Sequence, residues 1–129
     1  MKVVNLGLAK QLKEIGYPQE TGKIGFYWSI PEDKEEHAFV KYARIPDENN
    51  ELYKASGNKS FAAPSADEII DRLPLDVSFN KFEEGLYMVR WLEKVSMDNP
   101  MAKYHREIEG NLAEAAGRMW LYLKKEKLI

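Results

Sequence analysis

Residues 24–42, IGFYWSIPEDKEEHAFVKY, contain two apolar runs on either side of a charged turn. The first run, Ile24–Ile30, is rich in aromatic and β-branched residues and closes at Pro31, which is typical of a strand. The second run, His37–Tyr42, follows the polar segment Glu32–Glu36. Strands joined by a short charged loop most often pair side by side, so we predict an antiparallel hairpin.

A helix is predicted before this hairpin, over Asn5–Ile15. Its apolar residues recur at spacings of three and four, and Gly16 followed by Pro18 ends it. After the hairpin the pattern is weaker. Leu52–Ala55 is interpreted as a short strand with Ser60–Ala63 as its partner.

A second helix is predicted from Ser65 to Leu73. Ser65 and Glu68 have the spacing of a capping box, and Pro74 stops the helix. Two strands follow, Val77–Phe82 and Leu86–Leu92. The latter carries apolar residues on both faces, which predicts a central strand covered on both sides.

The C-terminal third is predicted to hold an edge strand and a long helix. Asp98–Pro100 is interpreted as a turn and Ala102–Ile108 as an edge strand, with a helix as the alternative for that segment. Asn111 is the expected N-cap of the last helix. Its buried stripe is expected to comprise Leu112, Ala115, Ala116, Met119, Trp120 and Leu123, with Glu114, Arg118, Lys124 and Lys125 facing outward.

The order of these elements predicts an α+β fold. We expect an antiparallel β-sheet, built from a hairpin and a meander, packed against two or three helices as an α/β sandwich. The 129 residues contain no repeat and no linker long enough to divide them, so a single globular domain spanning 1–129 is expected.

Composition excludes several classes of function. The chain has no cysteine, which removes disulfides, thiol nucleophiles and zinc–thiolate sites. Nineteen Lys and Arg against twenty-one Asp and Glu leave a formal charge of −2, so no overall field favours nucleic acid or a membrane surface. No glycine-rich phosphate loop and no secretory or membrane-spanning run is present. We therefore expect a cytoplasmic protein without a cofactor or a bound metal.

The candidate binding residues are aromatic side chains and the two histidines of the chain: Tyr27, Trp28, His37, Trp91, Tyr104 and His105. A pocket between sheet and helix lined by several of them would suit a small molecule or peptide. Core packing of the aromatic residues is the competing interpretation. Tyr27 lies on the opposite face of its strand from Trp28, so one face is expected to present an aromatic ring to solvent or a partner.

Catalytic motifs are missing from the sequence. There is no G-x-S-x-G elbow, and the adjacent carboxylate pairs Glu35-Glu36, Asp67-Glu68 and Glu83-Glu84 do not by themselves face one cleft. A hydrolase that uses His37 or His105 with a neighbouring carboxylate is the least favoured hypothesis.

Four motifs in order resemble one group of proteins. They are GYPQET at 16–21, FYW at 26–28, APSADEIIDRLP at 63–74 and NLAEAAGRMWLYLKK at 111–125. In this order they resemble small uncharacterised proteins of bacteria and their prophages, common among Bacteroidetes, and Asp76–Ile108 matches the pattern only loosely. The resemblance implies an α+β sandwich and a bacterial or phage origin, and it implies no activity.

These observations favour a non-enzymatic accessory protein of phage or mobile-element origin that acts through contact with an unknown protein partner or with itself. The motivation is the combination of exposed aromatic residues and strand edges with the lack of catalytic motifs. The alternative is a small-molecule or peptide-binding domain with an aromatic pocket between sheet and helix.

Overall fold

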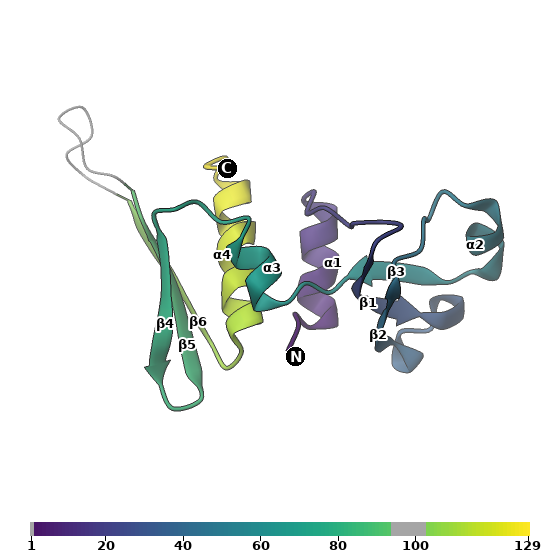
Figure 1. Ribbon diagram of the computed structural model, residues 1–129, viewed down its shortest axis with the longest axis horizontal. Coiled ribbons are helices and arrows are strands. Elements are labelled where there is room, and N and C mark those ends of the chain that lie inside the picture. The colour runs from purple at the N-terminus through teal and green to yellow at the C-terminus, as the bar shows by residue number, and fades with distance from the viewer. Residues whose placement is uncertain (1, 94–102) are drawn as a thin grey trace. The chain divides into compact units, whose positions relative to one another are not determined.

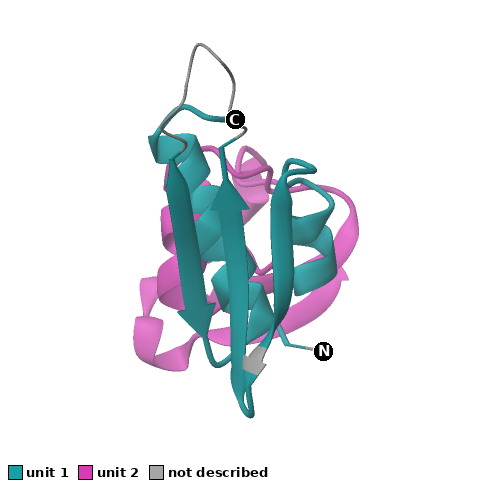
Figure 2. Cartoon of the chain, turned by 90° about the vertical axis from the view of Figure 1, so that its left-hand side faces the viewer, with its two compact units in different colours: residues 1–2, 66–129 teal, residues 3–65 magenta. Residues whose placement is uncertain are grey.

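The computed structural model of the protein describes residues 2–93 and 103–129 (Figure 1). The chain divides into two compact units, which Figure 2 colours separately. In chain order, we call residues 3–65 the first unit (magenta, keyed unit 2 in Figure 2) and residues 1–2 with 66–129 the second unit (teal, keyed unit 1). Within the described residues, each unit contains one three-stranded antiparallel sheet together with helices. The predicted α+β class is confirmed, with the strands distributed over two sheets. The single domain over 1–129 stays a prediction.

The first unit begins with α1 (Leu6–Glu14), as the apolar spacing predicts. The Asn5 side chain caps it by accepting a hydrogen bond of 2.8 Å from the Leu8 N–H. Leu8 and Leu12 are buried. Gly16, at φ +101°, supplies the left-handed residue that ends the helix.

The first sheet has the order β2-β1-β3, with β1 (Ile24–Ile30) in the centre. The predicted hairpin is confirmed, because β1 pairs antiparallel with β2 (Phe39–Arg44). The prediction that His37 starts the second strand was wrong. Two single-turn helices, η1 (Pro31–Asp33) and η2 (Glu35–His37), occupy the connection and keep His37 out of the sheet.

The segment after the hairpin was also predicted wrongly. Leu52–Ala55 lies in a short helix, α2 (Glu51–Ser56), and does not form a strand. Asn50 caps this helix through hydrogen bonds from the N–H groups of Leu52 and Tyr53, and Gly57 ends it at φ +75°. β3 (Lys59–Ala62) therefore pairs with β1. Two local caps override a strand-like composition here.

The second unit contains α3 (Ala66–Ile70), β4 (Val77–Glu83), β5 (Leu86–Leu92), β6 (Tyr104–Glu109) and α4 (Leu112–Lys125). The sheet order β4-β5-β6 confirms the central position of β5 and the edge position of β6. On β5, Val89 and Trp91 are buried on one face, whereas Leu92 on the other face is 53% exposed, so the predicted cover on both sides is incomplete. The predicted turn at Asp98–Pro100 lies outside the described residues.

Helix α4 packs against α3, β5 and β6. Its predicted N-cap is confirmed, since Asn111 accepts a hydrogen bond of 2.8 Å from the Ala113 N–H. The prediction that Glu114 faces outward was wrong, because Glu114 is buried. The whole run 113–117 is buried, so the start of this helix is covered on more than one side.

Candidate protein-contact surface on the first sheet

The six predicted site residues belong to different units. The first unit holds Tyr27, Trp28 and His37, and the second holds Trp91, Tyr104 and His105.

In the first unit, the structure shows which face of β1 is buried, a point that the alternation of residues along the strand left open. Tyr27 is only 4% exposed and belongs to the core. Trp28 lies on the opposite face and is half-buried, and its Nε1–H donates a hydrogen bond of 2.9 Å to the Val4 carbonyl. His37 is exposed in η2. The aromatic face turned toward solvent is therefore the one that carries Phe26 and Trp28.

In the second unit, Trp91 and His105 are opposite each other on β5 and β6. Trp91 is buried, and its Nε1–H donates to Asp76 Oδ2 at 3.1 Å. The His105 ring stacks on Tyr122 of α4, with centroids 3.5 Å apart. These contacts fix the sheet on the helix, as the core-packing interpretation expects.

The remaining predicted residue of that unit lies apart from this cluster. Tyr104 is opposite Leu92, on the other face from Trp91, and is 51% exposed. His105 Nε2 lies 2.8 Å from Glu107 Oε1, which is the one histidine–carboxylate pair among the candidates. Over residues 2–93 and 103–129, no three His, Asp or Glu side chains are placed to hold a metal ion.

The half-exposed face of the first sheet, which we call the aromatic face, is assembled by strand register. Phe26 is opposite Tyr42, and Trp28 lies between Val40 and Phe61. The Phe26 and Tyr42 rings are 4.6 Å apart at 46°, and Tyr42 is 63% exposed. The members of this face are Ile24, Phe26, Trp28, Val40, Tyr42 and Phe61.

The outer edge of β3 is closed by side chains. The Ala62 N–H donates to Gln19 Oε1 at 2.9 Å, and the Ser60 carbonyl accepts from Lys13 Nζ at 3.0 Å. Lys13 Nζ also lies 2.5 Å from Glu48 Oε1 and 4.8 Å from the centre of the Phe61 ring. The outward N–H of Ala62 and the outward carbonyl of Ser60, which another strand would need, are therefore occupied.

The outer edge of β2 is open. Ile45, just past the strand, exchanges both backbone hydrogen bonds with the β1 side, at Lys23 and Gly22. Because bonding alternates along an antiparallel ladder, the N–H and C=O groups that point away from β1 belong to Val40, Tyr42 and Arg44. In the described part of the chain, these N–H groups donate no hydrogen bond and these C=O groups accept none.

The side chains of β2 add apolar surface to that open edge. Phe39 is 48% exposed on one face of the strand, while Val40 and Tyr42 are exposed on the other. The charged residues of the strand, Lys41 and Arg44, are both cations. An edge strand with free backbone groups and exposed aromatic rings is a template for pairing with another chain.

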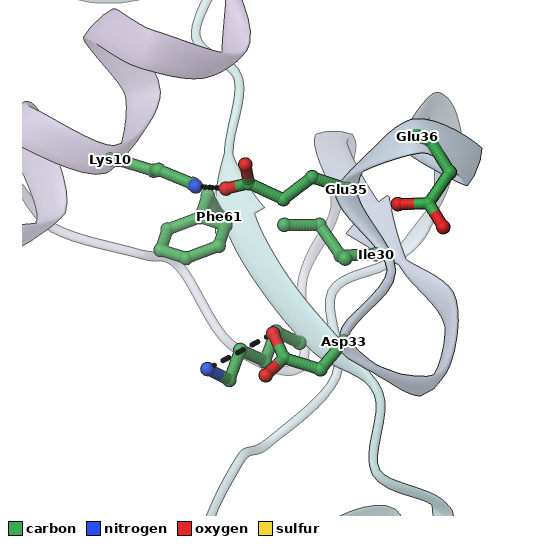
Figure 3. A pocket seen from close by; sticks show the side chains of 7 residues that line it. Lys10, Ile30, Asp33, Glu35, Glu36 and Phe61 are labelled. Carbon is green, nitrogen blue, oxygen red and sulfur yellow. Dashed lines mark ion pairs between the residues drawn. The ribbon is translucent and has the colours of Figure 1, made fainter.

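An open cavity of about 420 Å³ lies beside β3 (Figure 3). Its cations are already paired: Lys10 with Glu35, and Lys59 Nζ with Asp33 Oδ1 at 3.1 Å. The lining residues are Lys10, Ile30, Asp33, Glu35, Glu36, Lys59 and Phe61. None of the six predicted site residues lines it, so this cavity does not correspond to the predicted aromatic pocket.

Comparison with known proteins adds no relative: no family model, curated protein or solved structure matches the chain. Within the residues that the structure places, no helix combines the length and apolar character needed to cross a bilayer.

Sequence reasoning missed Val40 and Tyr42, which make the β2 edge distinctive. A signal was present, because residues 39, 40 and 42 put large apolar side chains on both faces of one short strand. Such a strand must be covered on both faces or expose one of them.

Proposed function

We propose that this chain is a non-enzymatic accessory protein of the bacterial cytoplasm, of phage or mobile-element origin, that acts through protein–protein contact. The contact surface in this proposal is the open edge of β2 together with the adjoining aromatic face. The phage or mobile-element origin rests on the resemblance of the four ordered motifs.

The observation that carries the proposal is the free backbone edge of β2 flanked by exposed Phe39 and Tyr42. Proteins usually protect such edges with charge, bulges or covering side chains, because an exposed apolar edge recruits other strands. The β3 edge of the same sheet has that protection in Gln19 and Lys13. An edge with free backbone groups, on the opposite side of the sheet from an edge whose groups are bonded, fits selection for a partner that adds a strand.

Photo-crosslinking tests the contact surface in bacterial cells. Tyr42 is replaced by p-benzoylphenylalanine, and the matched control carries the same group at Tyr104, an exposed tyrosine on edge strand β6. We expect an adduct from position 42 that exceeds any from position 104. Excess wild-type protein should compete away an adduct with another protein and should itself enter an adduct with a second copy, whereas excess Tyr42→Pro protein should do neither.

The proposal fails if position 42 gives no adduct, or if positions 42 and 104 give adducts equally. It also fails if Tyr42→Pro competes as well as the wild type, because proline at position 42 removes the outward N–H that an added strand needs.

A further inference from the structure

We infer that the open edge of β2 pairs with β2 of a second copy of this chain, antiparallel and with a two-fold axis at Tyr42. This inference rests on the proposed contact function and names its partner.

The backbone selects this register. An axis at Tyr42 places Tyr42 opposite its own copy and Val40 opposite Arg44 of the second copy. All three outward-facing residues then form hydrogen-bonded pairs. An axis at Lys41 would place Arg44 opposite Ala38, outside the strand. An axis at Ala43 would place Val40 opposite Pro46, which has no N–H to donate.

The charges of β2 permit a second copy in this register. Lys41 lies opposite Ala43 of the second copy, and Arg44 lies opposite Val40, so no like charges are directly opposed. An axis at Lys41 would instead set two lysines face to face. Direct charge repulsion therefore disfavours the register with its axis at Lys41 and not the register with its axis at Tyr42.

The aromatic face complements itself across the axis. The two Tyr42 rings become direct cross-strand neighbours, and each extends the contact that Tyr42 makes with Phe26 at 4.6 Å. Arg44 of one copy lies diagonal to Tyr42 of the other, within reach of a cation–π contact. The two aromatic faces form one continuous apolar surface across a sheet of six strands.

Val40 offers a test specific to this register, because it is 37% exposed and lies opposite Arg44 of the second copy. Sedimentation equilibrium is measured on the wild type and on Val40→Gln, Val40→Glu and Val40→Lys. All three variants lose the same apolar side chain, so Val40→Gln is the neutral reference. Circular dichroism melting confirms that each variant is folded.

We expect a concentration-dependent dimer. Two symmetric Glu–Arg pairs should tighten the Val40→Glu dimer roughly two- to thirtyfold relative to Val40→Gln, and two Lys–Arg oppositions should weaken the Val40→Lys dimer by a similar factor. The inference is overturned if the wild type stays monomeric up to about millimolar concentration, where even a weak pair associates. A dimer with equal constants for Val40→Glu and Val40→Lys also overturns it.

The crosslink at position 42 separates this inference from the proposed function. An adduct of twice the 14.9 kDa chain supports both. An adduct of another mass, competed by the wild type, keeps the contact function and overturns pairing with a second copy. The absence of any adduct at position 42 overturns both.

Discussion

The two outer strands of the first sheet face the same physical problem, since each leaves a row of backbone donors and acceptors beyond the sheet. At β3 two distant side chains fill part of the row: Gln19 accepts from the Ala62 N–H, and Lys13 donates to the Ser60 carbonyl. At β2 the outward N–H and C=O groups of Val40, Tyr42 and Arg44 form no such bond with the described residues. One sheet therefore combines an edge that excludes another strand with an edge that can accept one.

The largest expected effect is a difference in the free energy of unfolding between proline variants at an inward and at an outward position of β2. Ala43→Pro removes an N–H that bonds to β1, so we expect the free energy of unfolding to fall by about 3 kcal/mol. Tyr42→Pro removes an outward N–H and the ring pair with Phe26, and should cost only about 1 kcal/mol. Urea unfolding measures both, and Tyr42→Ala gives the ring loss alone. If Tyr42→Pro costs as much as Ala43→Pro, the outward N–H is bonded and the edge is not open.

The next effect is the stability loss expected when the closed edge of β3 is opened by a substitution at Gln19. Gln19→Ala leaves the Ala62 N–H, on a residue only 7% exposed, without its acceptor. We expect a loss of about 2 kcal/mol in the free energy of unfolding. Gln19→Glu keeps an acceptor oxygen and should retain most of the stability. Equal losses in the two variants would show that the hydrogen bond to Ala62 does not protect this edge.

A smaller effect is the difference in stability loss expected on replacing each of the two lysines near Phe61. Lys13 has a 26% exposed side chain that bonds to Ser60 and Glu48, whereas Lys10 is 38% exposed and pairs with Glu35. We expect Lys13→Met to cost about 1 kcal/mol and Lys10→Met to cost less, because more exposed ion pairs contribute little. Chemical denaturation compares them. A larger loss for Lys10→Met would contradict the role assigned to Lys13.

The smallest expected effect is a loss of folding stability at alkaline pH, caused by Tyr27 and Tyr53 in the first unit. Burial raises the pKa of Tyr27 above 10.0, and it raises the pKa of Tyr53 in the same direction, with a further contribution from the Glu48 carboxylate. The folded chain then holds these phenol protons more tightly than the unfolded chain. Their contribution to stability is complete below pH 10 and is lost as the pH rises through the folded pKa. Unfolding midpoints between about pH 8 and 11.5 should show this decline, and Tyr27→Phe and Tyr53→Phe should flatten it. A slope unchanged in both variants would contradict the assignment.

Local patterns predicted much of the fold. Apolar spacing and caps located α1 and α4, and composition located β1 and the central strand β5. The helix α2 was missed although its caps, Asn50 and Gly57, are visible in the sequence. Its six residues are too few for periodicity to outweigh a strand-like composition.

The contact surface was harder to predict, for two physical reasons. A period of two places Tyr27 and Trp28 on opposite faces without saying which face is buried. The closure of β3 depends on side chains distant in sequence. Gln19 bonds to Ala62, 43 residues further along the chain, and Lys13 bonds to Ser60, 47 residues further along. Only the folded chain shows which edge those side chains protect.

Residue-resolved amide hydrogen exchange, at a concentration low enough to keep the chain monomeric, tests the difference between the two edges most directly. We predict that the amides of Val40, Tyr42 and Arg44 exchange at close to unprotected rates. The amides of Lys41 and Ala43, bonded to β1, and of Ala62, bonded to Gln19, should be slow. Protection of Val40, Tyr42 and Arg44 equal to that of Lys41 and Ala43 would contradict an open β2 edge.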